Sequence, residues 1–344
     1  MTDEAFQKSV NSEGRLFLVE RQLAVGHGHY SIALLARTST DAPRVLKVIV
    51  NPDGCTDTEI SAFLRVFSEC TEAERALLVS LESYFRDCLN RPCLVFEYCD
   101  GHDLLHAVRA RLREPPSSRR PFPESTVLRW ADQLVRAAIV LRDRKLAHSD
   151  IALRNVLLVS PKGTTPIAPG TAIAADRFDA MDARLGDLGS AQLTGLAARV
   201  SSGSGPPELK DDLHDSLSDA FDIGCVLRDV MLLRDPEAPA PSATAGSAPS
   251  GGVAEVKLDS AAYSERLRNL VQGMMNPDRS VRVTLDGALS ELAAITPAAA
   301  VRAAVPMVPV TDSTLQESKP DLKRVPSSLD DKQIVSKVHQ ALTA

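Results

Sequence analysis

One short segment carries an aspartate and an asparagine five residues apart, between a long amphipathic stretch and a β-like run. It reads LAHSDIALRNVLL over residues 146–158 and places the two side chains at Asp150 and Asn155. A carboxylate can orient an attacking hydroxyl group, and an amide oxygen can hold a metal ion beside it. The pair therefore predicts phosphoryl-transfer chemistry, and an Asx-rich loop after a helix is the alternative interpretation.

Three other motifs could complete such a site. Gly26 and Gly28 lie between two strand-like runs, where glycines let the backbone approach a phosphate closely, although a plain hairpin turn has the same pattern. Lys47 lies in an apolar run, where a buried charge needs a partner and an exposed strand face is the alternative. Asp187 ends a further strand-like run and precedes a leucine and a glycine. Each motif is weak evidence alone, so their order along the chain matters.

The elements that must position these residues change in character along the chain. Apolar runs broken by glycines predict strands within Leu16–Val50, and Cys93–Glu97 predicts another. Apolar residues at helical spacing predict helices over Thr56–Phe67 and Ser125–Arg142, and a more apolar, largely buried helix over Asp219–Leu233. The chain is therefore expected to have a small β-rich half followed by a larger helical half.

The composition limits the classes of function. The chain has 344 residues, of which 44% are hydrophobic and 24% charged, and this suits two ordinary domains or one bilobed domain. A net charge of -6 gives no general electrostatic case for binding nucleic acid or an anionic membrane. No apolar run approaches the roughly 18 residues of a membrane span, and the first residues are polar. Six cysteines without a CxxC pair indicate reduced thiols in a cytosolic or nuclear protein.

Taken in order, these motifs resemble the protein kinase family over residues 15–296. The family's catalytic-loop pattern HRDLxxxN is matched by residues 148–155, its DFG motif by residues 187–189 and its strand lysine by Lys47. Segments similar to the hinge, the APE motif, the start of the buried F helix and the terminal arginine segment occur at residues 94–104, 206–208, 219–224 and 275–284. The resemblance rests on the order and spacing of all these matches.

The resemblance implies an α+β, bilobal fold, with a five-stranded antiparallel β N-lobe that has one main helix and a mainly α-helical C-lobe. A polar leader is expected at residues 1–14, the N-lobe and hinge at 15–99 and the C-lobe at 100–296. Flexible insertions are expected within the C-lobe near residues 114–123, 161–175 and 236–252. Residues 297–344 are expected to be a mostly disordered tail, with either a docking helix or a marginal solvated helix at 331–343.

The resemblance also assigns roles to individual residues. Lys47 would hold the α- and β-phosphates of ATP, Asp150 would orient the substrate hydroxyl, and Asn155 and Asp187 would bind Mg²⁺. Arg154 belongs to the same catalytic loop. The residues expected around the nucleotide are the turn glycines Gly26 and Gly28, the adenine-sandwiching Val25, Ala33, Val45 and Leu157, the gatekeeper Phe96, and the hinge residues Glu97 and Cys99.

Two ion pairs follow from the same resemblance. Lys47 is expected to pair with Glu59, although Glu59 is closer in sequence than the family usually allows, and Glu69 is the alternative. Glu208 and Arg282 are expected to form an internal structural pair. Removing one partner of that pair would leave a buried charge, at a cost of roughly 3–5 kcal/mol.

Several positions depart from the family pattern. Ser149 replaces the arginine that reads phosphorylation of the activation loop, so such control is not expected. Ala152 replaces the lysine usual in serine/threonine kinases, and residues 152–155 resemble the tyrosine-kinase version. Ser201 lies where serine/threonine kinases place a hydroxyl residue, and this favours serine/threonine specificity. Leu188 in place of phenylalanine is a conservative change.

The sequence therefore predicts a protein kinase that transfers the γ-phosphoryl group of ATP, with Mg²⁺, to a serine or threonine of a protein substrate. Tyrosine is the alternative acceptor, no nucleic acid or membrane partner is expected, and the oligomeric state is not indicated. A pseudokinase that binds nucleotide or partners without turnover is a competing interpretation, opposed by the presence of Lys47, Asp150 and Asp187. A small-molecule phosphotransferase is another, opposed by the APE-like and F-helix segments.

Overall fold

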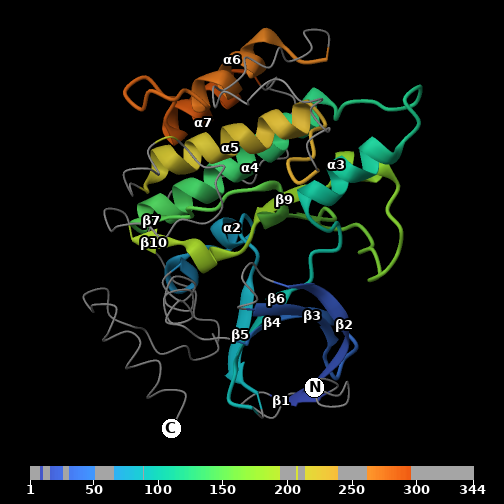
Figure 1. Ribbon diagram of the computed structural model, residues 1–344. Helices are drawn as coiled ribbons and strands as arrows, with labels where there is room; N and C mark the ends of the chain where they lie inside the picture. Colours follow the sequence, from blue (N-terminus) through green and yellow to red (C-terminus); the bar gives the residue numbers. More distant parts are fainter. Residues whose placement is uncertain are drawn as a thin grey trace, which may run out of the picture.

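The computed structural model describes residues 8–10, 16–25, 31–50, 66–87, 89–193, 207, 214–238 and 262–295, to which the structural statements below refer. The first part of the chain forms one antiparallel sheet in the order β1-β2-β3-β4-β6-β5. Its strands are β1 (Lys8–Val10), β2 (Leu16–Val25), β3 (Ser31–Arg37), β4 (Pro43–Ile49), β5 (Leu81–Arg86) and β6 (Pro92–Glu97). A mainly helical part follows, which confirms the predicted α+β, bilobal fold (Figure 1).

The sheet has one strand more than the five predicted. The extra strand, β1, lies within the expected polar leader and pairs with the outer edge of β2. The strands expected within Leu16–Val50 are β2, β3 and β4, and the one expected at Cys93–Glu97 is β6. One face of the sheet encloses a small core of its own, which contains Phe17, Leu34, Ala36, Leu46, Val48, Phe85, Cys93 and Val95.

Five helices longer than one turn are described in the second part. They are α3 (Leu104–Arg113), α4 (Glu124–Asp143), α5 (Ser216–Met231), α6 (Glu265–Met274) and α7 (Leu285–Ile295). Helices α4 and α5 lie side by side, with α6 and α7 beyond them (Figure 1). The short elements are α2 (Glu72–Arg75), β7 (Leu146–Ala147), β8 (Val156–Val159), β9 (Asp182–Leu185), β10 (Gln192–Leu193) and the 3₁₀ turns Leu153–Asn155, Ala175–Ala180 and Leu188–Ser190. Among the helices described, none is long and apolar enough to cross a membrane.

The two long helices confirm the helical spacing seen in the sequence. Helix α4 extends one residue beyond each end of the predicted Ser125–Arg142, and its apolar stripe is buried. Helix α5 begins three residues before the predicted start, because Asp215 caps it by accepting hydrogen bonds from two backbone N–H groups of the first turn. Of the helix predicted over Thr56–Phe67, only its last two residues are described, in a helical turn at 66–69.

The chain between β8 and β9 contains the insertion predicted near residues 161–175. This segment has no strand or α-helix, so hydrogen bonds to side chains hold its backbone in place. The buried Asp100 carboxylate accepts hydrogen bonds from the N–H and hydroxyl of Ser160, at 2.8 and 2.6 Å, and from the N–H of Ile167, at 2.7 Å. The first half of the insertion is thereby tied to the segment that leaves the sheet.

The residues between this insertion and β9 pack against α3 and α4. Phe178 is fully buried, and Asp179 forms an ion pair with the buried Arg111 of α3 at 2.6 Å. The indole N–H of Trp130 in α4 donates to the Met181 carbonyl oxygen at 2.8 Å. The expected insertion at 236–252 lies almost wholly outside the described residues, as does the tail at 297–344 with its helix at 331–343.

Replacement of Phe178 by alanine should lower the free energy of unfolding by about 3–5 kcal/mol, because a fully buried ring would leave a cavity. Urea unfolding followed by fluorescence of Trp130, the single tryptophan of the chain, measures this. Arg177→Ala, at an exposed neighbouring position, should change the same quantity by less than about 0.5 kcal/mol. Equal losses in the two variants would contradict the packing of this segment.

Candidate active site

A buried carboxylate of α5 fixes the backbone of the predicted catalytic loop. Asp219, only 1% exposed, accepts hydrogen bonds from the backbone N–H groups of His148, at 2.9 Å, and Ser149, at 3.1 Å. Burial raises the pKa of Asp219, whereas the neighbouring His148 and these two donors act in the opposite direction. Ser149 has a φ of 66°, in the left-handed region, so the chain turns sharply just before Asp150.

His148 joins the catalytic loop to the segment that carries Asp187. Its Nε2 donates to the carbonyl oxygen of Gly186 at 2.8 Å, while its Nδ1 accepts from the N–H of Asp150 at 3.3 Å. This pair of contacts selects Nε2 as the protonated nitrogen. An added β-carbon at Gly186 would lie 3.0 Å from side-chain carbons of Leu157 and Val79, so those side chains would have to shift to accept it. The two segments therefore have a fixed separation.

Three predicted catalytic residues meet in one hydrogen-bonded group. The Arg154 guanidinium lies 3.0 and 3.1 Å from the two carboxylate oxygens of Asp150. The side-chain N–H₂ of Asn155 donates to the Asp150 carboxylate at 3.0 Å and to its carbonyl oxygen at 2.7 Å. The carboxylate proposed to orient a hydroxyl is thus held on two sides.

Lys47 of β4 reaches across to Asp187, which follows β9. The two side chains form an ion pair at 2.7 Å, with exposures of 18% for Lys47 and 48% for Asp187. Burial alone would raise the pKa of Asp187, but the Lys47 charge and hydrogen bond, with smaller effects of His148 and the Gly189 N–H, lower it to about 2. Asp187 is therefore ionised at neutral pH and can offer its carboxylate to a cation.

The sheet places three of the residues predicted around adenine, Ala33, Val45 and Phe96, on the same face as Lys47. Residues directly opposite on paired antiparallel strands share a face, and Ala33 pairs with Lys47 while Val45 pairs with Phe96. Phe96 is buried, and Leu157 of β8 is partly buried. The backbone of Val25 pairs instead with Ile32, so the register does not group Val25 with Ala33 and Lys47. The register of three strands thus brings together residues that lie far apart in the sequence.

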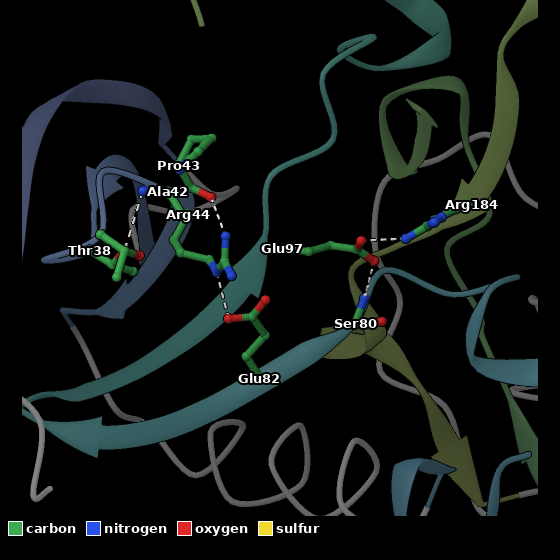
Figure 2. Close-up of polar contacts among 9 residues, drawn as sticks. Thr38, Ala42, Pro43, Arg44, Ser80, Glu82, Glu97 and Arg184 are labelled. Carbon is green, nitrogen blue, oxygen red and sulfur yellow. Dashed lines mark hydrogen bonds and ion pairs between the residues drawn. The ribbon is translucent and has the colours of Figure 1, made fainter. Parts of the chain in front are cut away.

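At the hinge, the side chain of Glu97 makes contacts that the sequence did not predict. Figure 2 shows its carboxylate between the N–H of Ser80, which donates at 2.7 Å, and the guanidinium of Arg184 on β9. The backbone N–H of Glu97 donates to the Ser80 carbonyl oxygen at 3.1 Å. Cys99 is buried, and burial raises the pKa of its thiol, so it is an unreactive packing residue. The opposite charges of Glu97 and Arg184 were the available signal, but their proximity depends on the tertiary fold.

Several predicted residues cannot be placed in this site. The residues outside the described part of the chain are Gly26, Gly28, Glu59, Ser201 and Glu208. Glu69, the alternative partner of Lys47, is exposed, and its carbonyl oxygen accepts from Arg144 at 3.1 Å. Arg282 is buried with its guanidinium 4.9 Å from the centre of the Phe221 ring. Its pairing with Glu208 stays a prediction.

The chemistry of the donors fits a magnesium ion held jointly with phosphate. Among the described residues, no group of three or more His, Cys, Asp or Glu side chains could form an all-protein metal site. Mg²⁺ is commonly bound by one or two protein groups together with substrate phosphates. Both side-chain hydrogen bonds of Asn155 to described residues use its nitrogen, which leaves its oxygen available, and Asp187 is half exposed. Asn155 and Asp187 therefore suit this role.

The protein kinase domain family matches residues 19–292, a span that contains most of β2, strands β3 to β6, the catalytic loop and the five long helices except the last three residues of α7. The chain belongs to the protein kinase domain family. The Lys47–Asp187 contact and the Asp150–Asn155 group lie within this kinase domain.

Curated relatives of the kinase domain are distant in sequence. The chain is 23% identical to the serine/threonine-protein kinase nekl-2 of Caenorhabditis elegans over 62% of its own length and 57% of the relative. It is 29% identical to the mouse serine/threonine-protein kinase Nek3 over 42% of its length and 24% of the relative. A probable serine/threonine-protein kinase of Dictyostelium discoideum is 27% identical over 59% of this chain and 15% of the relative. The chain thus spans less than two thirds of each of these relatives.

The lowered pKa of Asp187 predicts how its contribution to stability depends on pH. Its folded pKa of about 2 lies below the ordinary 3.8, so this contribution is complete above about pH 5 and is lost as the pH falls through 4 toward 2. The difference in free energy of unfolding between the natural chain and Asp187→Asn, measured in urea, should be constant from pH 7 to 5 and decrease below pH 4.

The exposed carboxylate of Asp176 provides the control. Asp176→Asn should give a small difference that does not follow the same pH course. A difference for Asp187→Asn that increases on acidification, or that already changes near pH 6, would contradict the Lys47–Asp187 pairing.

Proposed function

We propose that the chain is an ATP- and Mg²⁺-dependent protein kinase that phosphorylates serine or threonine side chains of protein substrates. The observation that supports this most directly is a pair of polar contacts whose segments are joined by the hydrogen bond from His148 to the Gly186 carbonyl oxygen. Asp150 and Asn155 contact each other at 3.0 Å in the catalytic loop, and Lys47 and Asp187 contact each other at 2.7 Å between the sheet and β9. The relatives described above are named as serine/threonine kinases, and this supports serine or threonine as the acceptor.

The chain's own residues would position the reactants rather than form covalent bonds with them. ATP supplies the phosphoryl group, and Mg²⁺ neutralises charge on its phosphates. Lys47 would donate to phosphate oxygens, while Asn155 and Asp187 would hold the metal. Asp150 would accept a hydrogen bond from the substrate hydroxyl and align it with the γ-phosphorus. As the new oxygen–phosphorus bond forms and the bond to ADP breaks, Asp150 would receive the hydroxyl proton.

Asp150→Asn should reduce turnover by about 10²–10⁴-fold, because an amide cannot accept the hydroxyl proton. The Kd for ATP should change by less than about twofold, since Asp150 contacts the acceptor rather than the nucleotide. Transfer of label from γ-³²P-ATP to casein measures the first quantity, and displacement of a fluorescent ATP analogue measures the second. Undiminished turnover would refute the role of Asp150. ATP binding without transfer in the natural chain would instead indicate a pseudokinase.

We infer that Arg154, the cationic residue two positions after Ala152, compensates for the absence of a lysine there. Serine/threonine kinases usually have a lysine at the position of Ala152, and the sequence of this loop is similar to that of tyrosine kinases. The Arg154 guanidinium lies against both oxygens of Asp150, where the transferred phosphoryl group would pass. We therefore assign it the stabilisation of phosphoryl charge. The same contact favours tyrosine as a second candidate acceptor.

Arg154→Ala should lower kcat by about 10²-fold, as expected when one donor to a developing charge is lost. Adding Ala152→Lys to this variant should raise kcat at least tenfold above that of Arg154→Ala alone. A lysine would again supply a positive charge near the phosphoryl group. Steady-state kinetics with γ-³²P-ATP measure both effects. The assignment fails if Arg154→Ala retains full kcat, or if the lysine restores nothing while the double variant remains folded.

A further inference from the structure

A groove of about 520 Å³ lies outside the proposed active site, between α3 and the end of the 161–175 insertion. None of its residues has a role in the phosphoryl-transfer site described above. Gly170, Thr171 and Ala172 on the insertion side are exposed, so the groove is open along its length rather than closed over a small molecule. The lining residues used below are His102, His106, Ala110, Arg113, Thr171 and Ile173.

One face of α3 and the residue before its cap form the floor of the groove. His102, His106, Ala110 and Arg113 follow at helical spacing, and so share a face. The two imidazole rings are stacked with centroids 4.4 Å apart, and His106 also contacts the edge of the Phe178 ring at 6.2 Å. Because Phe178 is fully buried beneath the insertion, the two walls have a fixed separation. The groove is therefore formed before any partner binds.

The groove carries a cation at its rim. Arg109, one turn earlier on α3, is neutralised by Asp235 at 2.7 Å and Glu237 at 2.9 Å. Arg113 is exposed, and no described carboxylate pairs with it. Glu114 also lines the groove, but its Oε2 atom is covered and receives no hydrogen bond from a described residue. The exposed guanidinium of Arg113 can therefore pair with a carboxylate of a partner, whereas the covered Oε2 atom of Glu114 is out of a partner's reach.

The rest of the floor is uncharged at neutral pH. Burial lowers the pKa of both imidazoles, and Asp103 opposes this for His102. For His106, the pKa is lowered further by His102, Arg113 and Arg109. Uncharged imidazoles stacked beside Ala110 and Ile173 can pack against an apolar side chain. An extended polypeptide can offer such a side chain and a carboxylate within a few residues.

We propose that this groove binds an extended segment of a partner protein in which an acidic residue adjoins an apolar one. The acidic side chain pairs with Arg113, and the apolar side chain covers the stacked imidazoles and Ile173. This role is independent of the phosphoryl-transfer chemistry, so a failure of one leaves the other standing.

The test selects random 12-residue peptides displayed on phage against the purified full-length chain, and then measures the Kd of enriched synthetic peptides by fluorescence polarisation. We expect enrichment of Asp or Glu beside an apolar residue.

Arg113→Glu should weaken binding by about tenfold or more, because it opposes like charges. A peptide with Lys in place of its acidic residue should then bind Arg113→Glu better than the natural chain. Thr171→Trp, at an exposed wall position, should block all these peptides.

The matched control is Arg120→Glu, which makes the same charge change at an exposed position outside the groove and should leave Kd within about twofold. Unchanged thermal unfolding midpoints establish that the variants are folded. Peptides without acidic residues, or peptides that bind Arg113→Glu as tightly as the natural chain, would overturn the proposal. Binding seen only after residues 239–261 are replaced by a Gly-Ser linker would also overturn it, because the occupant would then be the chain itself.

Discussion

The buried carboxylate of Asp219 is the constraint on which the rest of the site depends. It lies in the core helix α5 and receives the backbone N–H groups of His148 and Ser149, at 2.9 and 3.1 Å. A charged group that is 1% exposed is tolerated only when donors surround it, and those donors here belong to the catalytic loop. The turn just before Asp150 is therefore built into the hydrophobic core. Loss of this acceptor would leave two buried N–H groups without a partner and release the loop.

From this fixed loop, short contacts extend to both halves of the molecule. His148 binds the Gly186 carbonyl oxygen and so sets the position of the next residue, Asp187. Asp187 in turn pairs with Lys47 of the sheet. A second connection runs from Arg184 on β9 to Glu97 at the hinge (Figure 2). The sheet, the hinge and the helical part are thus joined by charged contacts on the side where the nucleotide is proposed to bind.

Residues with local signatures could be predicted from the sequence, whereas residues defined by tertiary proximity could not. Asp150, Asn155 and Asp187 lie in short motifs whose spacing is set by one loop or one turn, and the structure brings them together. Helix α4 was predicted to within one residue at each end, because its apolar stripe is regular. The strand β1 was missed because three residues in a polar stretch carry no periodic signal.

Ion pairs between residues far apart in the sequence could not be predicted. Asp179 meets Arg111 across 68 positions of sequence, and Arg184 meets Glu97 across 87, so no local pattern could indicate either pair. Asp219 was recognised only as part of a helix start, since its partners are backbone groups that leave no trace in residue type. The partner of Lys47 expected at Glu59 lies outside the described residues and stays a prediction.

The central claim is that this site transfers phosphate to protein hydroxyl groups. In the most direct measurement, the purified full chain is incubated with Mg²⁺, mixed protein substrates and ATP labelled on either the γ- or the α-phosphate. The labelled amino acid is then identified after acid hydrolysis of the protein. The account predicts phosphoserine or phosphothreonine labelled from γ-³²P-ATP and no label from α-³²P-ATP. Absence of protein label from γ-³²P-ATP, in a chain shown by thermal shift to bind ATP, would contradict it.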